Sequence, residues 1–235
     1  SGYAENLICA FGRIDGRAVG FVANNPMYAA GCIDADAADK GARFIRTCDA
    51  FNLPIVQFVD SPGFLPAVEE ERAGSSAAAA ALAYAFAEAQ VGTITVVTRK
   101  AFGPAYALLG SKGLGADLVF AWPTAQIAVM GAQGAVNILY RKQLAEAQAK
   151  GEDVEAARQA FISEYEDALA NPYVAAERGY IDAMIQPQDT RATLRRALRQ
   201  LRSKDVPEVL KVGISAAVGA YIVFIALRGA GFVVA

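Results

Sequence analysis

The chain has 235 residues and a formal net charge of −2, with acidic and basic residues interspersed along it. The length allows one domain plus an appendage, and the charge gives no reason to expect nucleic acid as a partner. Histidine is absent, which excludes Ser-His-Asp and Cys-His nucleophile systems, a histidine general base and a histidine-ligated metal.

The three cysteines, Cys9, Cys32 and Cys48, show no CxxC spacing. Neither a disulfide framework nor a zinc site is indicated, so we expect no metal and a reducing, cytoplasmic setting. The chain begins with Ser1-Gly2 and not with methionine. Such a start is typical of a processing or cloning remnant and hints at a longer parent.

Short apolar runs that predict strands alternate with helical segments through the first two thirds of the chain. The expected strands are 6–11, 18–23, 55–59, 94–98, 118–121 and 127–130. Between the first two, Asp15-Gly16 is typical of a hairpin turn. The alternation of strands and helices predicts the α/β class.

Three helices are expected among these strands. Residues 36–51 and 152–169 show the amphipathic period of surface helices, and 74–90 is so rich in alanine that its propensity predicts a helix. The arginines of a later helical segment predict a solvated helix face: Arg191, Arg195, Arg196, Arg199 and Arg202. No GxGxxG or P-loop is present, so nucleotide binding has no motif to support it.

Several segments resemble, in order along the chain, the C-terminal half of a biotin-dependent acyl-CoA carboxylase carboxyltransferase (beta) subunit of the propionyl-CoA carboxylase type. They include Phe58-Val-Asp-Ser-Pro-Gly-Phe-Leu-Pro66, Thr98-Arg-Lys-Ala-Phe-Gly103 and Ala121-Trp-Pro-Thr-Ala-Gln-Ile-Ala-Val-Met-Gly131. The resemblance covers roughly residues 3–201. It implies a crotonase-like superhelix of ββα repeats, with no covalently bound cofactor, biotin on a partner carrier protein and an acyl-CoA substrate.

The resemblance also implies where the site lies. Backbone N–H groups at Gly103 and Ala105 would stabilise an oxyanion. The residues that would bind substrate or biotin are Gly63, Phe64, Leu65, Gly74, Tyr106, Ala107, Gly131 and Gly134. The 60–66 loop can equally be a rigid connector that follows a strand, and this is compatible with a role in the site. The small residues at 131–134 would allow close approach of biotin or of another chain.

Three segments depart from the family's pattern. Gly-Gly-Ala-Tyr-Asp is here Gly103-Pro-Ala-Tyr-Ala107, and proline has no N–H to donate. The arginine, second glycine and lysine that usually follow Leu-Pro have become alanines within 77–81. A Ser-Lys-His-Leu is here Ser111-Lys-Gly-Leu114.

These departures favour an oligomeric scaffold or assembly module, natural or engineered, in which the active site is degraded. The alternative is a carboxyltransferase half-subunit that moves CO₂ from carboxybiotin to a short-chain, propionyl-CoA-like substrate together with a separate N-domain. Self-association, most simply as a trimer, is expected under both hypotheses because a half-subunit exposes broad apolar faces.

A second unit, an apolar tail at 204–235, is expected after a domain at 1–203. From Val212 to Leu227 the tail carries no charge. As a helix this run would be about 24 Å long, short of the roughly 30 Å hydrocarbon thickness of a bilayer. We expect a helix from about Pro207 to Leu227 that packs against another subunit, with membrane contact through 212–235 as the less favoured alternative.

Overall fold

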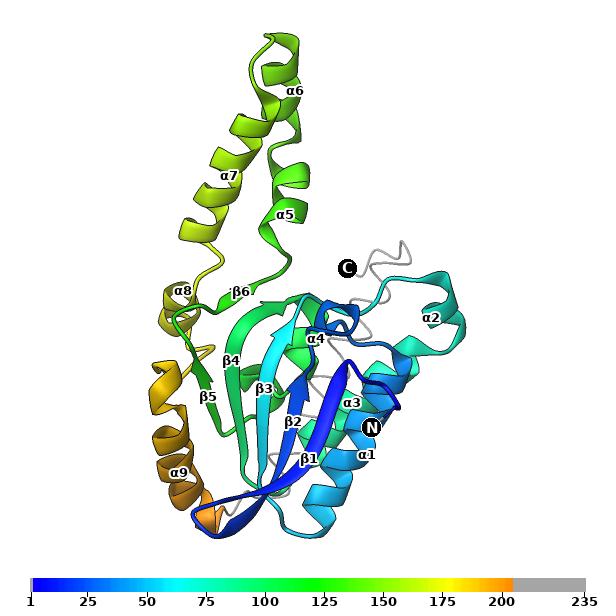
Figure 1. Cartoon of the computed structure of the whole chain (residues 1–235), viewed down its shortest axis with the longest axis vertical. Helices are drawn as coiled ribbons and strands as arrows, with labels where there is room; N and C mark the ends of the chain where they lie inside the picture. The colour runs from blue at the N-terminus through cyan, green and yellow to red at the C-terminus, as the bar shows by residue number, and fades with distance from the viewer. Residues whose placement is uncertain (1, 205–235) are drawn as a thin grey trace, which may run out of the picture.

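The computed structural model describes residues 2–204, which form one mixed sheet flanked by helices (Figure 1). Its strands are β1 (Leu7–Ile14), β2 (Arg17–Asn24), β3 (Ile55–Ser61), β4 (Thr93–Phe102), β5 (Leu118–Ala121), β6 (Gln126–Ala128) and β7 (Ala183–Met184). The order is β1-β2-β3-β4-β5-β7, and β6 also pairs with β4. β1 and β2 are antiparallel, and every other pairing among the described strands is parallel.

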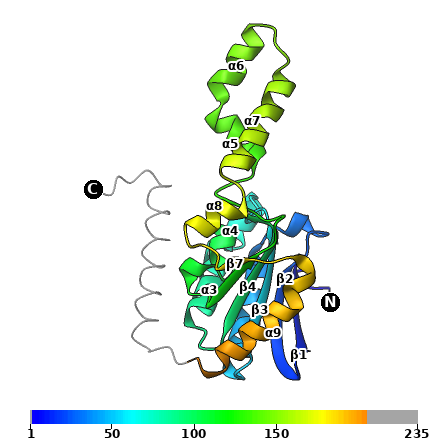
Figure 2. The same cartoon turned by 90° about the vertical axis from the view of Figure 1, so that its left-hand side faces the viewer.

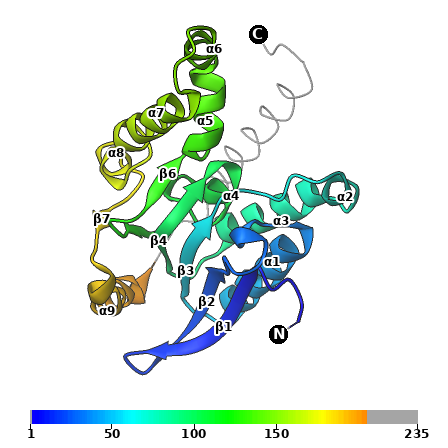
Figure 3. The same cartoon turned by 45° about the horizontal axis from the view of Figure 1, so that its top comes forward.

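Helices cover both faces of this sheet. On one face lie α1 (Ala35–Ala50), α2 (Val68–Arg72), α3 (Ser75–Glu88) and α4 (Gly103–Leu108), and on the other lies α9 (Thr190–Gln200), as Figure 3 shows. Short 3₁₀ turns connect the elements: η1 (Ala29–Gly31), η2 (Lys112–Leu114), η3 (Pro187–Asp189) and η4 (Leu201–Ser203). α1, α3 and α9 bury apolar side chains against the strands, which is what holds an α/β domain together, whereas no residue of α2 is buried.

A helical arm projects from the sheet (Figures 1 and 2). It consists of α5 (Ala132–Leu139), α6 (Arg141–Ala149) and α7 (Val154–Ala168), and α8 (Pro172–Glu177) leads back to the body. The arm has its own small core, in which Val136 and Leu144 pack with Ile162 and Tyr165. Tyr140 stacks on Phe161 with ring centroids 4.3 Å apart.

The two sheet faces bury separate clusters. Leu7, Val22, Ile45 and Leu82 belong to the cluster under α1 and α3, while Val56, Val96 and Leu198 belong to the cluster under α9. Adjacent strand residues point to opposite faces, so Ile55 and Val56 divide between the two clusters. This two-sided burial explains why the central strands read as continuous apolar runs.

The predicted α/β class and the six predicted strands are confirmed, as are the three helices, to within a few residues at their ends. The hairpin is also confirmed, with Asp15 and Gly16 at φ of 53° and 78°, as a type I′ turn requires. The sequence missed β7, which has two residues, both exposed. The three cysteines are free thiols.

The expected tail helix lies outside the described residues. Lys204 is the last described residue, and its Nζ lies 2.7 Å from Asp117 Oδ2 and 3.0 Å from the Val91 carbonyl oxygen. Among the helices of residues 2–204, none combines the length and the apolar character needed to cross a membrane.

Candidate functional site

Three loops that the sequence singled out begin at the carboxyl edge of the sheet. Gly103 follows β4 directly, Gly63 lies two residues after β3, and Gly131 lies three residues after β6. Since β4 pairs in parallel with both β3 and β6, these three strands end on the same side of the sheet. The carboxyl edge of a parallel sheet is where ligand sites of α/β folds are built.

Gly103 brings two of these loops into close approach. Its φ is +58°, and a Cβ at this position would stand 3.0 Å from the carbonyl oxygen of Val129. Both observations require glycine, because an L side chain would be strained by the backbone and crowded by the oxygen. The loop after β4 and the loop after β6 are therefore in contact through the backbone.

The starts of α4 and α5 form the second feature of this edge. Phe102 is the N-cap of α4 and Gly131 is the N-cap of α5, and neither makes a side-chain capping hydrogen bond. First-turn N–H groups have no acceptor within their own helix, and the helix start carries partial positive charge. Pro104 supplies no donor, whereas the N–H of Ala105 remains.

The side chains of α4 divide between core and surface. Ala105 is fully buried, while Pro104 and Ala107 are exposed. Tyr106 is half-buried, and burial, with a smaller contribution from Tyr180, raises the pKa of its phenol to about 12. The hydroxyl of Tyr106 therefore stays protonated at neutral pH and can donate a hydrogen bond.

The loop after β3 is held by backbone hydrogen bonds. The Ile33 N–H donates to the Gly63 carbonyl oxygen at 3.0 Å, and the Leu65 N–H donates to the Ile33 carbonyl oxygen at 2.8 Å. Phe64 packs against the core under α1 and α3, so the loop is the rigid connector that the sequence predicted. Gly63 itself lies in open space, with nothing within 4 Å of the position of a Cβ.

Gly74 and Gly134 are less closely tied to this edge. Gly74 is the N-cap of α3 at φ of 85°, and its backbone hydrogen bonds join it to Glu71 and to the first turn of α3. Gly134 is an exposed residue of α5. The structure brings Gly103, Ala105, Gly131 and Gly63 to one edge, with Gly134 exposed in the first turn of α5, and it leaves Gly74 at the start of α3.

A polar cluster beside these loops was not predicted from the sequence. Asp60, on β3, accepts hydrogen bonds from Arg99 Nε at 3.2 Å and from the Lys100 N–H at 3.2 Å. The side-chain oxygen of Asn24 accepts from the Asp60 N–H at 3.2 Å, and Lys100 Nζ donates to the Ala30 carbonyl oxygen at 3.1 Å. The position of these residues at the ends of neighbouring parallel strands was the signal that could have found them.

The donor set fits an oxyanion better than a metal. Within the described residues no group of three or more His, Cys, Asp or Glu side chains could hold a metal ion. Two uncapped helix starts next to each other offer backbone N–H donors instead, which is the arrangement that stabilises developing negative charge on oxygen. Pro104 leaves this set one donor short of what a glycine would supply.

A family model described as "Carboxyl transferase domain" matches residues 1–214. The chain is 60% identical to the propionyl-CoA carboxylase beta chain of Saccharopolyspora erythraea over 202 residues, which is 86% of this chain and 37% of that protein. It is 58% identical to the biotin-dependent acetyl-/propionyl-coenzyme A carboxylase beta5 subunit of Mycobacterium tuberculosis (strain H37Rv), covering 87% of the chain and 37% of the relative.

Solved structures of carboxyltransferases are also similar to this chain. The transcarboxylase 12S structure, described as a hexamer assembly with methylmalonyl-coenzyme A and methylmalonic acid bound, superposes with a TM-score of 0.82 at 48% identity, covering 88% of this chain and 39% of that one. The beta subunit of the geranyl-CoA carboxylase of P. aeruginosa superposes with a TM-score of 0.72 at 25% identity, covering 86% and 39% of the two chains. The expected crotonase-like fold is confirmed, and the chain spans less than two fifths of the length of these relatives.

Proposed function

Because the chain belongs to the carboxyl transferase domain family, we propose that it forms half of a site that carboxylates a short-chain acyl-CoA. The other half, an N-domain, would come from sequence outside these residues, joined or separate. Biotin on a partner carrier protein would supply the carboxyl group. This chain spans 37% of the length of each of the two beta subunits compared above, and those longer chains would contain the N-domain as well.

One observation carries the proposal: the uncapped starts of α4 and α5 meet at the carboxyl edge of the sheet. Carboxylation at the α-carbon of a thioester first requires loss of a proton, which leaves negative charge on the thioester oxygen. N–H donors that are fixed in place stabilise that charge without reorganisation. The first turn of α5 offers exposed donors, and the N–H of Ala105, a fully buried residue, would be the second donor.

Gly103 and the 63–65 loop would position these donors. Gly103 permits the backbone contact with Val129, so the start of α4 is fixed relative to the loop that leads into α5. The backbone hydrogen bonds between Ile33 and the 63–65 loop make one wall of the edge rigid. Rigid donors matter because misplacement by about 1 Å can cost on the order of 10²-fold in rate.

The scaffold that the sequence favoured is the second candidate. Its support is Pro104, which lacks an N–H, and the alanines of α3. Identity of 60% to a propionyl-CoA carboxylase beta chain and the positive φ of Gly103 beside Val129 support carboxyl transfer better. Self-association is proposed under both candidates, supported by the hexamer described for the 12S relative.

The test is a transfer assay with the full chain. The chain would be mixed with the separately produced N-terminal half of the Saccharopolyspora erythraea relative, carboxybiotin and propionyl-CoA, and carboxylated product would be measured. We expect product above that formed by the N-terminal half alone. The absence of product, together with an intact oligomer and a folded chain, would favour the scaffold.

A matched pair of glycine variants adds specificity to this assay. Gly103→Ala should reduce the transfer rate by about 10²-fold because the added Cβ displaces the donor loop. Gly113→Ala is the control, since only Ser111 Oγ, at 3.9 Å, lies near its Cβ position. Equal rates for the two variants would contradict the assignment of the site to the Gly103 loop.

A further inference from the structure

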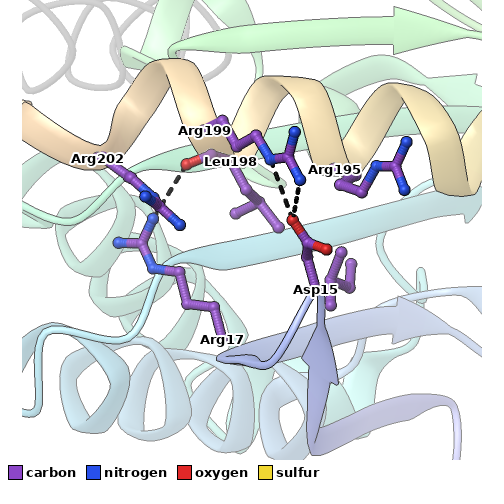
Figure 4. Close-up of a pocket in the computed structure, with 7 residues that line it drawn as sticks. Asp15, Arg17, Arg195, Leu198, Arg199 and Arg202 are labelled. Carbon is purple, nitrogen blue, oxygen red and sulfur yellow. Dashed lines mark hydrogen bonds and ion pairs between the residues drawn. The ribbon is translucent and has the colours of Figure 1, made fainter.

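An arginine-rich surface lies at the end of the sheet opposite to the candidate site. The turn between β1 and β2 approaches α9 and η4 there, and Figure 4 shows Asp15 and Arg17 facing Arg195, Arg199 and Arg202. The surface presents four arginines against one aspartate in a chain whose formal net charge is −2. We call these four arginines and Asp15 the arginine row.

Contacts within the chain occupy only part of this row. Arg199 Nε donates to Asp15 Oδ2 at 3.0 Å, and Arg17 donates to the Leu198 carbonyl oxygen at 3.0 Å. Arg195 and Arg202 make no ion pair or side-chain hydrogen bond within residues 2–204. Their charge still acts on Asp15, whose pKa is lowered by the hydrogen bond from Arg199 first and then by the field of the three helix arginines.

Folding stability gives no reason for this concentration of charge. The side chains of Arg199 and Asp15 are 57% and 37% exposed, and an exposed ion pair contributes little to stability. The remaining like charges repel one another. All four cations are arginines, whose planar guanidinium groups match carboxylates in two parallel hydrogen bonds, which lysine cannot do.

A groove continues from this row. It has a volume of about 760 Å³ and lies between α8, β7 and α9. Its lining combines the apolar side chains of Tyr173, Met184 and Ile185 with the charged ones of Asp189, Arg195 and Arg196. Arg195 lines both the groove and the arginine row. Tyr173 is 62% exposed and Met184 37% exposed, so the described chain leaves this lining uncovered.

The shape favours an extended protein segment over a small anion or a nucleic acid. The cavity beside Asp15 holds about 10 Å³, room for about one water molecule. No aromatic side chain lines that cavity, so a base would find no stacking platform there.

We propose that the groove and the arginine row together dock an acidic segment of a partner protein. An apolar side chain of that segment occupies the groove, and carboxylates bind Arg195 and Arg202. The two arginines lie seven residues apart along a helix and its terminal turn, which corresponds to about 10 Å. Side chains that face one surface from an extended segment are two or four residues apart, which is about 7 or 13 Å, and the long arginine side chains make up the difference, so the partner carries an apolar anchor followed by two acidic residues spaced by two or four.

The test is selection from a library of random 12-residue peptides displayed on phage, against the full chain. Counter-selection uses Arg195→Glu/Arg202→Glu, checked for folding by circular dichroism, with Arg195→Gln/Arg202→Gln as a neutral second variant. We expect enriched peptides with the anchor and acid spacing, and binding of a selected peptide weakened at least about tenfold by either variant. The control Arg141→Glu/Lys142→Glu, on exposed positions of α6, should leave binding unchanged.

Three outcomes overturn the proposal. Enriched peptides without acidic residues would show that the arginine row is not the docking surface. Equal weakening by the α6 control would show attraction by overall charge alone. Tighter binding of a 20-nucleotide single strand than of the selected peptide, lost in the Arg195→Glu/Arg202→Glu variant, would assign the surface to nucleic acid.

Discussion

At the scale of single residues, two features of the described chain stand out: a position whose backbone requires glycine, and a buried polar side chain without a hydrogen-bond partner. Gly103 illustrates the first, since its positive φ and its approach to Val129 leave no room for a side chain. Gln57 illustrates the second. It is fully buried on β3, and neither its side-chain nitrogen nor its side-chain oxygen has a hydrogen-bond partner.

Pro104 is the residue whose replacement bears most directly on chemistry. Pro104→Gly restores one N–H, and a single oxyanion donor is typically worth about 10²–10³ in rate. We expect the gain to stay below about tenfold, because residues that act as a unit do not respond additively and α3 still lacks its cations. Steady-state kinetics in the transfer assay would check this. A gain near 10³ would show that Pro104 alone limits the site.

Gln57 predicts an increase in stability on substitution. Gln57→Met replaces the unpaired amide with an apolar side chain of similar length, which removes a desolvation penalty of about 1–3 kcal/mol. The free energy of unfolding, measured by urea titration, should therefore rise by about 1–3 kcal/mol. The control Gln143→Met, at an exposed position of α6, should change it by less than about 0.5 kcal/mol. A loss of stability in Gln57→Met would mean that the amide has a partner.

At the scale of elements, the sheet positions the candidate site while the α5–α7 arm stands apart with its own core. The arm depends on local features that the sequence encodes clearly. Asp153 caps α7, accepting hydrogen bonds from the N–H groups of Glu155 at 3.0 Å and Ala156 at 3.1 Å. A side-chain cap of this kind satisfies first-turn donors and places negative charge at the positive helix end.

Asp153→Ala should therefore destabilise the arm by about 1 kcal/mol. Amide hydrogen exchange is the suitable measurement, because the arm can open without global unfolding, and exchange in α7 should accelerate roughly fivefold. Asp167→Ala is the matched control, since it removes an exposed acid from the last turn of the same helix, where negative charge is unfavourable. Similar acceleration in both variants would argue against a capping effect.

At the scale of the whole molecule, the arm and the loop leading into it carry exposed apolar side chains, among others elsewhere on the described surface. Val129 is 78% exposed, Ile138 65% and Leu139 59%. Patches of this kind mark surfaces that bind another protein chain. Together with the hexamer described for the 12S relative, they support self-association of this chain.

We therefore expect a homo-oligomer, most simply a trimer, in solution. Ile138→Glu/Leu139→Glu should lower the mass measured by light scattering, because charges would be buried in the interface at high cost. The control is Lys142→Glu, a charge change on the exposed surface of α6. A monomeric native chain, or an unchanged mass in the double variant, would exclude this surface as the interface.

The sequence alone determined the local elements and the family. Strand and helix periods are short-range properties, so the runs at 55–59 and 94–98, the Asp15-Gly16 turn and the alanine-rich α3 could be identified without the tertiary structure. The loops around Gly103 and Gly131 were likewise identified as segments, and at Gly103 the positive φ is the local reason for glycine.

Only the tertiary structure decided which of these segments meet. Parallel strand order brings the loops after β3, β4 and β6 to one edge, and this order depends on pairings between residues far apart in the chain. The contact of Gly103 with Val129, the polar cluster of Asp60 with Lys100, and the approach of Asp15 to Arg199 across 184 residues all follow from it. The arginines of α9 looked like a solvated face because helical spacing cannot show that the β1–β2 turn lies opposite them.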